Sequence, residues 1–139
     1  VLAVAKDAKN HTGVVFVVDT LEFLHRGGRI GGAARLLGTA LNLKPILELQ
    51  DGVIEPLERV RTRSKAQARL LGILEERIKG RPNLRLAVLH AAAEREARQL
   101  LDVAAKQLNP METVFSEVSP VVGAQVGPGT LGMCYSVDL

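Results

Sequence analysis

Four glycines and an arginine stand together near the start of the chain, in the run Gly27-Gly28-Arg29-Ile30-Gly31-Gly32. Glycine permits positive φ angles and leaves the backbone amides accessible. Amides at the start of a helix attract anions, and a guanidinium can bind a carboxylate or a phosphate through two parallel hydrogen bonds. The run therefore indicates an anion site with Arg29 as its charged group. The same residues are also typical of a tight turn with a solvated arginine.

The residues that follow the glycines predict a helix over 33–43. Their apolar side chains recur at helical spacing and would form one stripe, which consists of Ala33, Leu36, Leu37, Ala40 and Leu41. One interpretation places an apolar ligand tail along this stripe, with its anionic head at the glycines. The other is an ordinary core helix. The run lacks the Gly-Lys-Ser/Thr of a nucleotide phosphate loop.

A second glycine-rich segment lies at residues 123–129, inside a stretch that we predict to be loop from 119 to 130. Its backbone amides, with the carboxamide of Gln125 and the flexible Gly127, could also approach an anion. A tight connection between two strands is the alternative interpretation.

The residues of catalytic and metal sites are sparse in this chain. It has three histidines and one cysteine, and no Ser/His/Asp or Cys/His set is visible. His90 stands at the end of a predicted strand, as either a ligand group or a structural residue. Cys134 alternates with apolar residues and resembles a small core residue. We therefore expect no enzyme, no metal site and no cofactor.

The arginines at 59, 61 and 63 alternate with other residues in a segment that we predict to be strand from 53 to 62. In a strand they would share one face. One hypothesis is a regulatory domain that binds nucleic acid, another anion or an acidic protein through this face. A solvated face is the alternative, and the absence of interleaved aromatic residues argues against nucleic acid.

Apolar patterns predict the elements that must position these residues. Short apolar or alternating runs predict strands at residues 14–18, 44–50, 53–62, 84–90, 111–118 and 131–137. Helical spacing predicts helices at 1–8, 65–79 and 94–108. Asp51-Gly52 is a hairpin signal, and Pro56 places the following strand at an edge or a bulge. The expected fold is α/β with α+β character: a mixed, largely antiparallel sheet with helices mainly on one face.

Composition is consistent with one domain and an aliphatic core. The chain has 139 residues, 47% of them hydrophobic and 3% aromatic, with a formal net charge of +3. The single cysteine excludes an internal disulfide. No apolar run reaches the roughly 18 residues of a membrane span, and no signal peptide is visible. A cytoplasmic protein is the expectation.

Several motifs in order resemble the carboxy-terminal domain of the DegV family of bacterial fatty-acid-binding proteins. They are Asp19-Thr20-Leu21-Glu22-Phe23-Leu24, Gly27-Gly28-Arg29-Ile30, Leu36-Leu37-Gly38, Leu43-Lys44-Pro45-Ile46, Glu58-Arg59-Val60-Arg61-Thr62-Arg63, Gly123 and Gly127-Pro128-Gly129. The resemblance covers nearly the whole of residues 1–139, and it implies that the amino-terminal domain of the family is absent from this chain.

The resemblance implies a lipid-binding domain that forms one wall of an acyl-chain site between two domains. It also implies a long-chain fatty acid as ligand and a fatty-acid kinase as possible partner, with serine and threonine supplied by the other domain. The implied ligand residues are Gly28, Arg29, Ile30, Ala33, Leu36, Leu37, Leu41, Gln125 and Gly127. Gln125 stands where the family commonly has histidine, so it cannot become cationic. Without its other domain, the chain is expected to self-associate through exposed apolar residues.

Overall fold

The computed structural model describes residues 1–38 and 43–139 of the chain. Its strands are β1 (Thr12–Val17), β2 (Lys44–Gln50), β3 (Val53–Val60), β4 (Arg85–His90), β5 (Glu112–Glu117) and β6 (Leu131–Ser136). Its helices are α1 (Leu2–Lys9), α2 (Glu22–Arg26), the 3-10 helix η1 (Gly31–Leu36), α3 (Arg63–Ile78), α4 (Glu94–Leu108) and α5 (Pro120–Val126).

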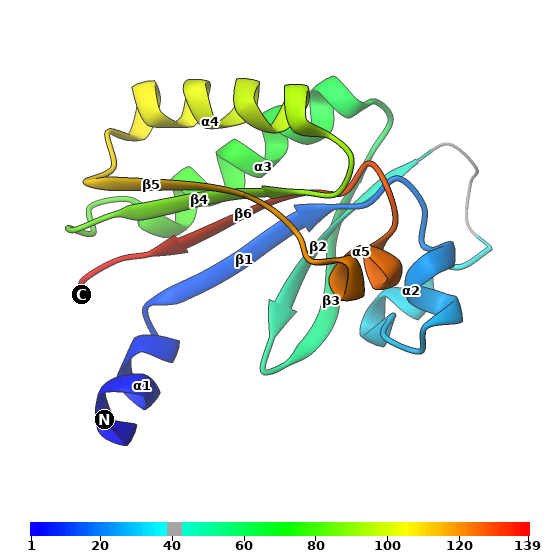
Figure 1. Cartoon of the computed structure of the whole chain (residues 1–139), viewed down its shortest axis with the longest axis horizontal. Helices are drawn as coiled ribbons and strands as arrows, with labels where there is room; N and C mark the ends of the chain where they lie inside the picture. The colour runs from blue at the N-terminus through cyan, green and yellow to red at the C-terminus, as the bar shows by residue number, and fades with distance from the viewer. Residues whose placement is uncertain (39–42) are drawn as a thin grey trace.

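The six strands form one sheet in the order β3-β2-β1-β6-β4-β5 (Figure 1). Only the β4–β5 pair is parallel, and the other four pairs are antiparallel. This confirms the predicted mixed, largely antiparallel sheet. β3 is an edge strand that contains Pro56, and its pairing with β2 shifts register at Ile46/Leu47. Both effects expected of that proline are therefore present.

Helices α3 and α4 cover one face of the sheet (Figure 1). Alternate residues of the strands point toward them, including Val15, Val17, Leu86 and Val88, and form the main core. The opposite face carries the short helices α2, η1 and α5 at one end. There a second core forms between strands and short helices, and it consists of Phe16, Val18, Leu24, Ile30, Ala33, Leu47 and Ile54.

The helix predicted for residues 33–43 is wrong in type and length. The segment begins as the 3-10 helix η1 at Gly31 and ends at Leu36, and Leu37 is extended with φ −64° and ψ 136°. Gly31 has φ +56°, and a Cβ at this position would lie 2.5 Å from the carbonyl oxygen of Ile54. Close packing against β3 therefore sets the path of this segment, and helical spacing does not. Ala40 and Leu41 lie outside the described residues.

The loop predicted for residues 119–130 contains helix α5. Ser119 caps it, since its side chain accepts a hydrogen bond from the amide of Val122, and Pro120 occupies the first turn. Serine followed by proline is a good helix start. Gly123 within the helix and Gly127 and Gly129 after it concealed this signal.

The strand predicted to carry three arginines on one face is shorter than expected. β3 ends at Val60, and Thr62 caps α3 by accepting a hydrogen bond from the amide of Lys65. Arg59 therefore belongs to the strand, Arg61 to the turn and Arg63 to the helix. The three guanidinium groups do not share a strand face.

An ion pair between β3 and α3 makes stability depend on pH. Arg69 donates to Glu58 through Nε at 2.9 Å and Nη2 at 2.6 Å. These hydrogen bonds lower the pKa of Glu58. A carboxyl whose pKa is lowered by folding contributes stability above its unfolded pKa, about 4.3, and loses it as the pH falls through the folded value.

We expect Glu58→Gln to lower the free energy of unfolding by about 0.2–1 kcal/mol near neutral pH. The difference from wild type should shrink as the pH falls below about 4.3 and through the lowered pKa of folded Glu58, because the wild-type carboxylate then becomes protonated. Urea denaturation of both proteins at two pH values measures this difference in the free energy of unfolding. Glu75→Gln serves as control, because it removes an exposed carboxylate from α3, the helix that carries Arg69. An equal loss of stability in Glu58→Gln and Glu75→Gln would contradict a stabilising ion pair between Glu58 and Arg69. A loss in Glu58→Gln that does not change with pH would contradict it as well.

Candidate functional site

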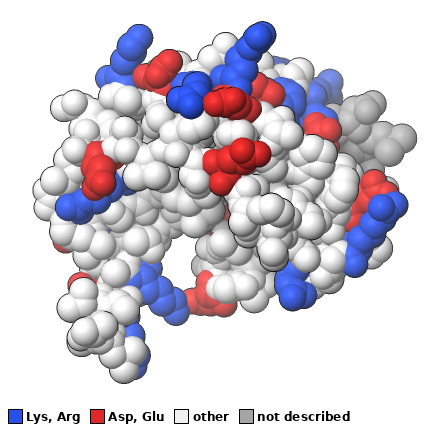
Figure 2. Space-filling model, viewed as in Figure 1, with Lys and Arg blue, Asp and Glu red and all other residues white. Residues whose placement is uncertain are grey.

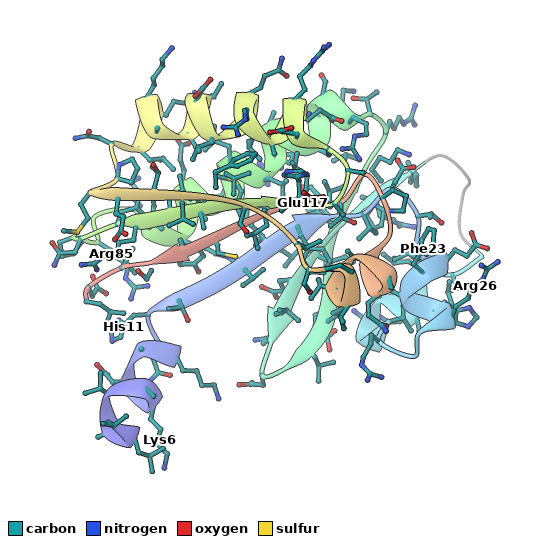
Figure 3. The ribbon with its side chains drawn as sticks, viewed as in Figure 1. Lys6, His11, Phe23, Arg26, Arg85 and Glu117 are labelled. Carbon is teal, nitrogen blue, oxygen red and sulfur yellow. The ribbon has the colours of Figure 1, made fainter. Side chains whose placement is uncertain are left out.

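The two glycine-rich segments predicted from the sequence meet in the structure. Helix α2 packs against α5, and a Cβ at Gly27 would overlap Oε1 of Gln125. A Cβ at Gly127 would likewise overlap the ring of Phe23, which α2 places beside α5 (Figure 3). Gly28 and Arg29 directly follow this contact. The structure therefore gathers the predicted polar residues at one end of the sheet.

Arg29 is exposed and only weakly held by the chain itself. Its Nη1 donates to the carbonyl oxygen of Gly27 at 3.4 Å, a long hydrogen bond. No carboxylate of the described residues pairs with it. Most of its donors therefore remain available to an anion. By contrast, the neighbouring Arg26 is paired with Glu22 within α2.

Gln125 presents a polar atom that the described part of the chain leaves unsatisfied. Its Oε1 is buried and has no hydrogen-bond partner among those residues. A buried acceptor without a donor costs about 1–3 kcal/mol. The oxygen lies against Gly27, so the contact between the two glycine segments is made at the expense of this hydrogen bond.

The described members of the predicted apolar stripe, Ala33, Leu36 and Leu37, do not share one surface. Ile30 and Ala33 are buried in the second core. Leu36 lines a separate hollow with Arg35 and residues 56–59 of β3. Leu37 is 39% exposed, and Leu41 lies outside the described residues. Among the apolar candidates that the structure describes, Ile30 and Ala33 therefore pack in one core and Leu36 and Leu37 do not belong to it.

A polar network that sequence reasoning missed lies after the end of β1. Asp19 accepts from Lys44 Nζ at 2.8 Å and lies 3.8 Å from Arg63 Nη1. The side chain of Asp19 does not cap the following helix α2. Thr20 instead accepts a hydrogen bond from the amide of Glu22. Asp19 joins the first strand to β2 and α3.

Arg63 connects this network to the second glycine segment. Its Nη1 donates to the carbonyl oxygen of Gly129 at 2.7 Å, and its Nε donates to Glu96 at 2.9 Å. Gln67 donates to the same Glu96 oxygen at 2.8 Å. Arg63 Nη2 is buried and has no partner among the described residues. Motifs from three separate stretches thus share one network, which only the tertiary fold reveals.

His90 is a structural residue in this arrangement. It is 4% exposed, and its Nδ1 accepts a hydrogen bond from the amide of Ala93 at 3.1 Å. Its ring packs against Phe115, with centroids 5.4 Å apart. The histidine therefore holds the turn that leads into α4.

Two further findings concern the described residues 1–38 and 43–139. No group of three His, Cys, Asp or Glu side chains there is placed to hold a metal ion. No helix within these ranges has the length and apolar character required to cross a membrane.

A mixed six-stranded sheet with long helices on one face and short helices at one end of the other face defines an α/β class of domain. The family model described as "Uncharacterised protein, DegV family" matches residues 1–138. The chain belongs to the DegV family.

Similar proteins agree with this assignment. The chain is 48% identical over 126 residues to a DegV domain-containing protein of Streptomyces coelicolor, covering 90% of this chain and 44% of the relative. It is 37% identical over 131 residues to the protein DegV of Bacillus subtilis, and the match covers 94% of this chain and 46% of the relative. The chain thus spans about half the length of these relatives.

Solved structures give the same result. A DegV family protein from Thermus thermophilus, described by its fatty acid binding, superposes with a TM-score of 0.91 at 38% identity, covering 98% of this chain and 49% of that one. DegV from Bacillus subtilis, described as a fatty acid binding protein, gives a TM-score of 0.84 at 34% identity. The superposition covers 99% of this chain and 49% of that one.

Proposed function

We propose that this chain binds a long-chain fatty acid as one wall of a site between two domains. The observation that carries the proposal is the contact of Gly27 with Gln125 and of Phe23 with Gly127, which places both glycine segments beside Gly28 and Arg29. The similar structures are described as fatty-acid-binding. A fatty acid needs donors for its carboxylate and apolar surface for its tail. The glycine segments and the second core supply these side by side.

Arg29 is the proposed contact to the carboxylate. Its guanidinium is exposed and makes one long hydrogen bond within residues 1–38 and 43–139, so it can rotate toward a ligand at small cost. Glycine amides and the Gln125 carboxamide can donate to the same carboxylate. Ile30, which follows Arg29 and keeps 9% of its surface exposed, would contact the first methylenes of the tail, while Ala33 packs fully buried in the same core.

The site is incomplete within this chain. Gln125 Oε1 lacks a donor among the described residues, and a carboxylate removed from water requires several hydrogen-bond partners. The family resemblance supplies a source, since serine and threonine of the amino-terminal domain are expected to face this carboxylate. A hydroxyl from that domain would add a donor for the ligand carboxylate.

The full-length protein is proposed to present the fatty acid to a kinase. A fatty acid kinase B3 protein of Streptococcus pneumoniae, loaded with linoleic acid, shares the fold with a TM-score of 0.84 at 18% identity. The suggestion of a kinase partner comes from the family resemblance. An exposed Arg29 leaves the carboxylate end open to a second protein, as phosphorylation requires.

Extraction and calorimetry test the proposed function. Organic extraction of the purified full-length protein should release fatty acid that mass spectrometry identifies. In titrations of delipidated protein with palmitate, we expect the full-length protein to bind at least about tenfold more tightly than residues 1–139, because the carboxylate gains the missing hydroxyl partners.

Hexadecanol, which has the same chain length without the carboxylate, is the matched control ligand. It should bind the full-length protein more weakly than palmitate does. Equal affinities of the two proteins for palmitate would show that the site lies wholly within this chain. The absence of any binding to the full-length protein would overturn the function itself.

A further inference from the structure

The guanidinium of Arg63 lies at the base of both glycine-rich segments. Asp19, whose carboxylate is 3.8 Å from Arg63 Nη1, directly precedes the stretch that forms α2 and the first glycine segment. The carbonyl oxygen of Gly129, which accepts from the same Nη1 at 2.7 Å, closes the second segment after α5. The end of β1, the start of α3 and the connection from α5 to β6 meet at this point (Figure 1).

Arg63 donates a charged hydrogen bond to the backbone of the second glycine segment. Two neutral hydrogen bonds also hold this backbone. The amide of Gly129 donates to the carbonyl oxygen of Ala91 at 2.7 Å, and the buried hydroxyl of Thr130 donates to that of Gly127 at 2.9 Å. A hydrogen bond from a charged donor is roughly twice as strong as a neutral one. The contact from Arg63 is therefore the strongest of the three.

Arg63 occupies a helix position that disfavours a positive charge. It is the first residue of α3, directly after the N-cap Thr62, and Lys65 follows two positions later. The amino end of a helix carries partial positive charge and favours acidic residues. Helix α4 obeys this rule with two glutamates in its first turn. Residues that break a local rule are expected at functional sites, so the tertiary contacts of Arg63 explain its position better than the helix does.

The acidic partners of Arg63 each have a second donor. Asp19 also accepts from Lys44 at 2.8 Å, and Glu96 also accepts from Gln67 at 2.8 Å. Within the part of the chain that the structure describes, the carbonyl oxygen of Gly129 has Arg63 as its donor. Loss of the guanidinium would therefore release the glycine segment, while both carboxylates would keep a partner.

We propose that Arg63 is a positioning residue for the fatty-acid carboxylate. The inference rests on the proposed function and deepens it by naming the group that sets the spacing between Arg29 and Gln125. Asp19 ties Arg63 to the start of the first segment, and Gly129 ties it to the end of the second. A binding constellation must be held to within about 0.5 Å of its productive geometry. Arg63 acts through the two segments and does not itself contact the ligand.

Long-range attraction of an anion is the alternative role for this arginine. Figure 2 shows acidic and basic side chains interspersed along the upper edge of the molecule, where α4 lies. Arg63 itself is paired with Glu96 at 2.9 Å. Attraction at a distance depends on unbalanced charge, so the contacts of Arg63 favour positioning.

Titration of the delipidated full-length protein with palmitate and with hexadecanol tests the proposal. In Arg63→Ala we expect the Kd for palmitate to rise by at least about tenfold, because the donors to the carboxylate lose their spacing. The Kd for hexadecanol should stay nearly the same, since an alcohol carries no charge that these donors must match. A merely structural loss would weaken the binding of both ligands by the same factor.

Arg63→Lys is the rescue variant, because lysine keeps the charge and can still donate to the carbonyl oxygen of Gly129. It should recover most of the affinity for palmitate. Lys65→Ala is the matched control, since it removes one positive charge from an exposed position of the same helix turn. It should bind palmitate as wild type does. Arg63→Gln, a milder change that keeps an amide donor, repeats the comparison with less risk to folding.

Amide hydrogen exchange in the delipidated protein tests the same role without any ligand. In Arg63→Ala the amide of Gly129 should exchange at least about tenfold faster, because its segment opens more often. The amide of Met111, which donates to the carbonyl oxygen of Leu84 at the other end of β4, should exchange at the wild-type rate.

Equal palmitate affinity of Arg63→Ala and wild type would overturn the inference and leave the proposed function intact. An equal loss for palmitate and hexadecanol, an equal loss in Lys65→Ala, or an unchanged exchange rate of Gly129 would overturn it as well. A wild-type protein that binds no palmitate would overturn both the proposed function and this inference.

Discussion

Replacing Arg29 with alanine in the full-length protein is expected to weaken fatty-acid binding by about 1.5–3 kcal/mol, or roughly 10- to 150-fold in Kd. This is the contribution of a hydrogen bond to a charged group. The change should leave folding intact, because Arg29 is exposed and makes a single long hydrogen bond to the Gly27 carbonyl. Calorimetric titration with palmitate measures the effect.

Arg26→Ala is the matched control for this experiment. Arg26 lies three residues earlier, is also exposed, and pairs with Glu22 rather than facing an open donor site. Both changes remove one positive charge from the same region. If Arg29→Ala and Arg26→Ala weaken palmitate binding by the same factor, general charge attraction explains the loss of affinity. Arg29 then does not contact the carboxylate.

Substitution of Gly127 by alanine is expected to separate α2 from α5. Gly127 has φ +84° and ψ 164°, a conformation that is essentially restricted to glycine. A Cβ there would also overlap the ring of Phe23. Backbone strain and overpacking together should lower the free energy of unfolding by about 2–4 kcal/mol. Urea denaturation measures this, and palmitate affinity should fall with it.

Gly80→Ala separates the two causes. Gly80 has φ +73°, but a Cβ there would meet no atom within 4 Å. It should therefore cost only the left-handed backbone strain, roughly 1 kcal/mol. An equal loss of stability at both positions would mean that the Phe23 contact is unimportant and that the two glycine segments are not held together as described.

Most of the sheet and both long helices could be predicted from local patterns. The alternation in β6 and the apolar run of β4 identify buried strands, and the stripes of α3 and α4 identify helices that cover a sheet. These elements bury enough apolar surface for periodicity alone to define them. The edge position of β3 followed from Pro56.

The path of residues 31–37 could not be predicted in the same way. The leucine spacing is helical, yet contact with β3, some twenty residues later, holds Gly31 at a positive φ angle. Tertiary packing here overrides the local pattern. Helix α5 was missed for a different reason, since glycines outweighed a good Ser119-Pro120 start.

For the site, the residue types could be predicted but not all of the connections. Glycine content pointed to both segments, and the structure brings Gly27 and Gln125 together. The role of Arg63 depends on Asp19, Glu96 and Gly129, which are distant in the sequence. No local spacing indicates such a network.

The strand order has a consequence for the timing of folding. β6 pairs with β1 on one side and with β4 on the other, so it is the only link between β1-β2-β3 and β4-β5 in the described sheet. Until residues 131–136 have been synthesised, β1 and β4 each present an unpaired edge, and Val15 and Val88 have no shared core. Contacts of such large sequence separation form slowly. A nascent chain of this protein therefore carries two incomplete sheet pieces, both prone to aggregation, until its sixth strand leaves the ribosome.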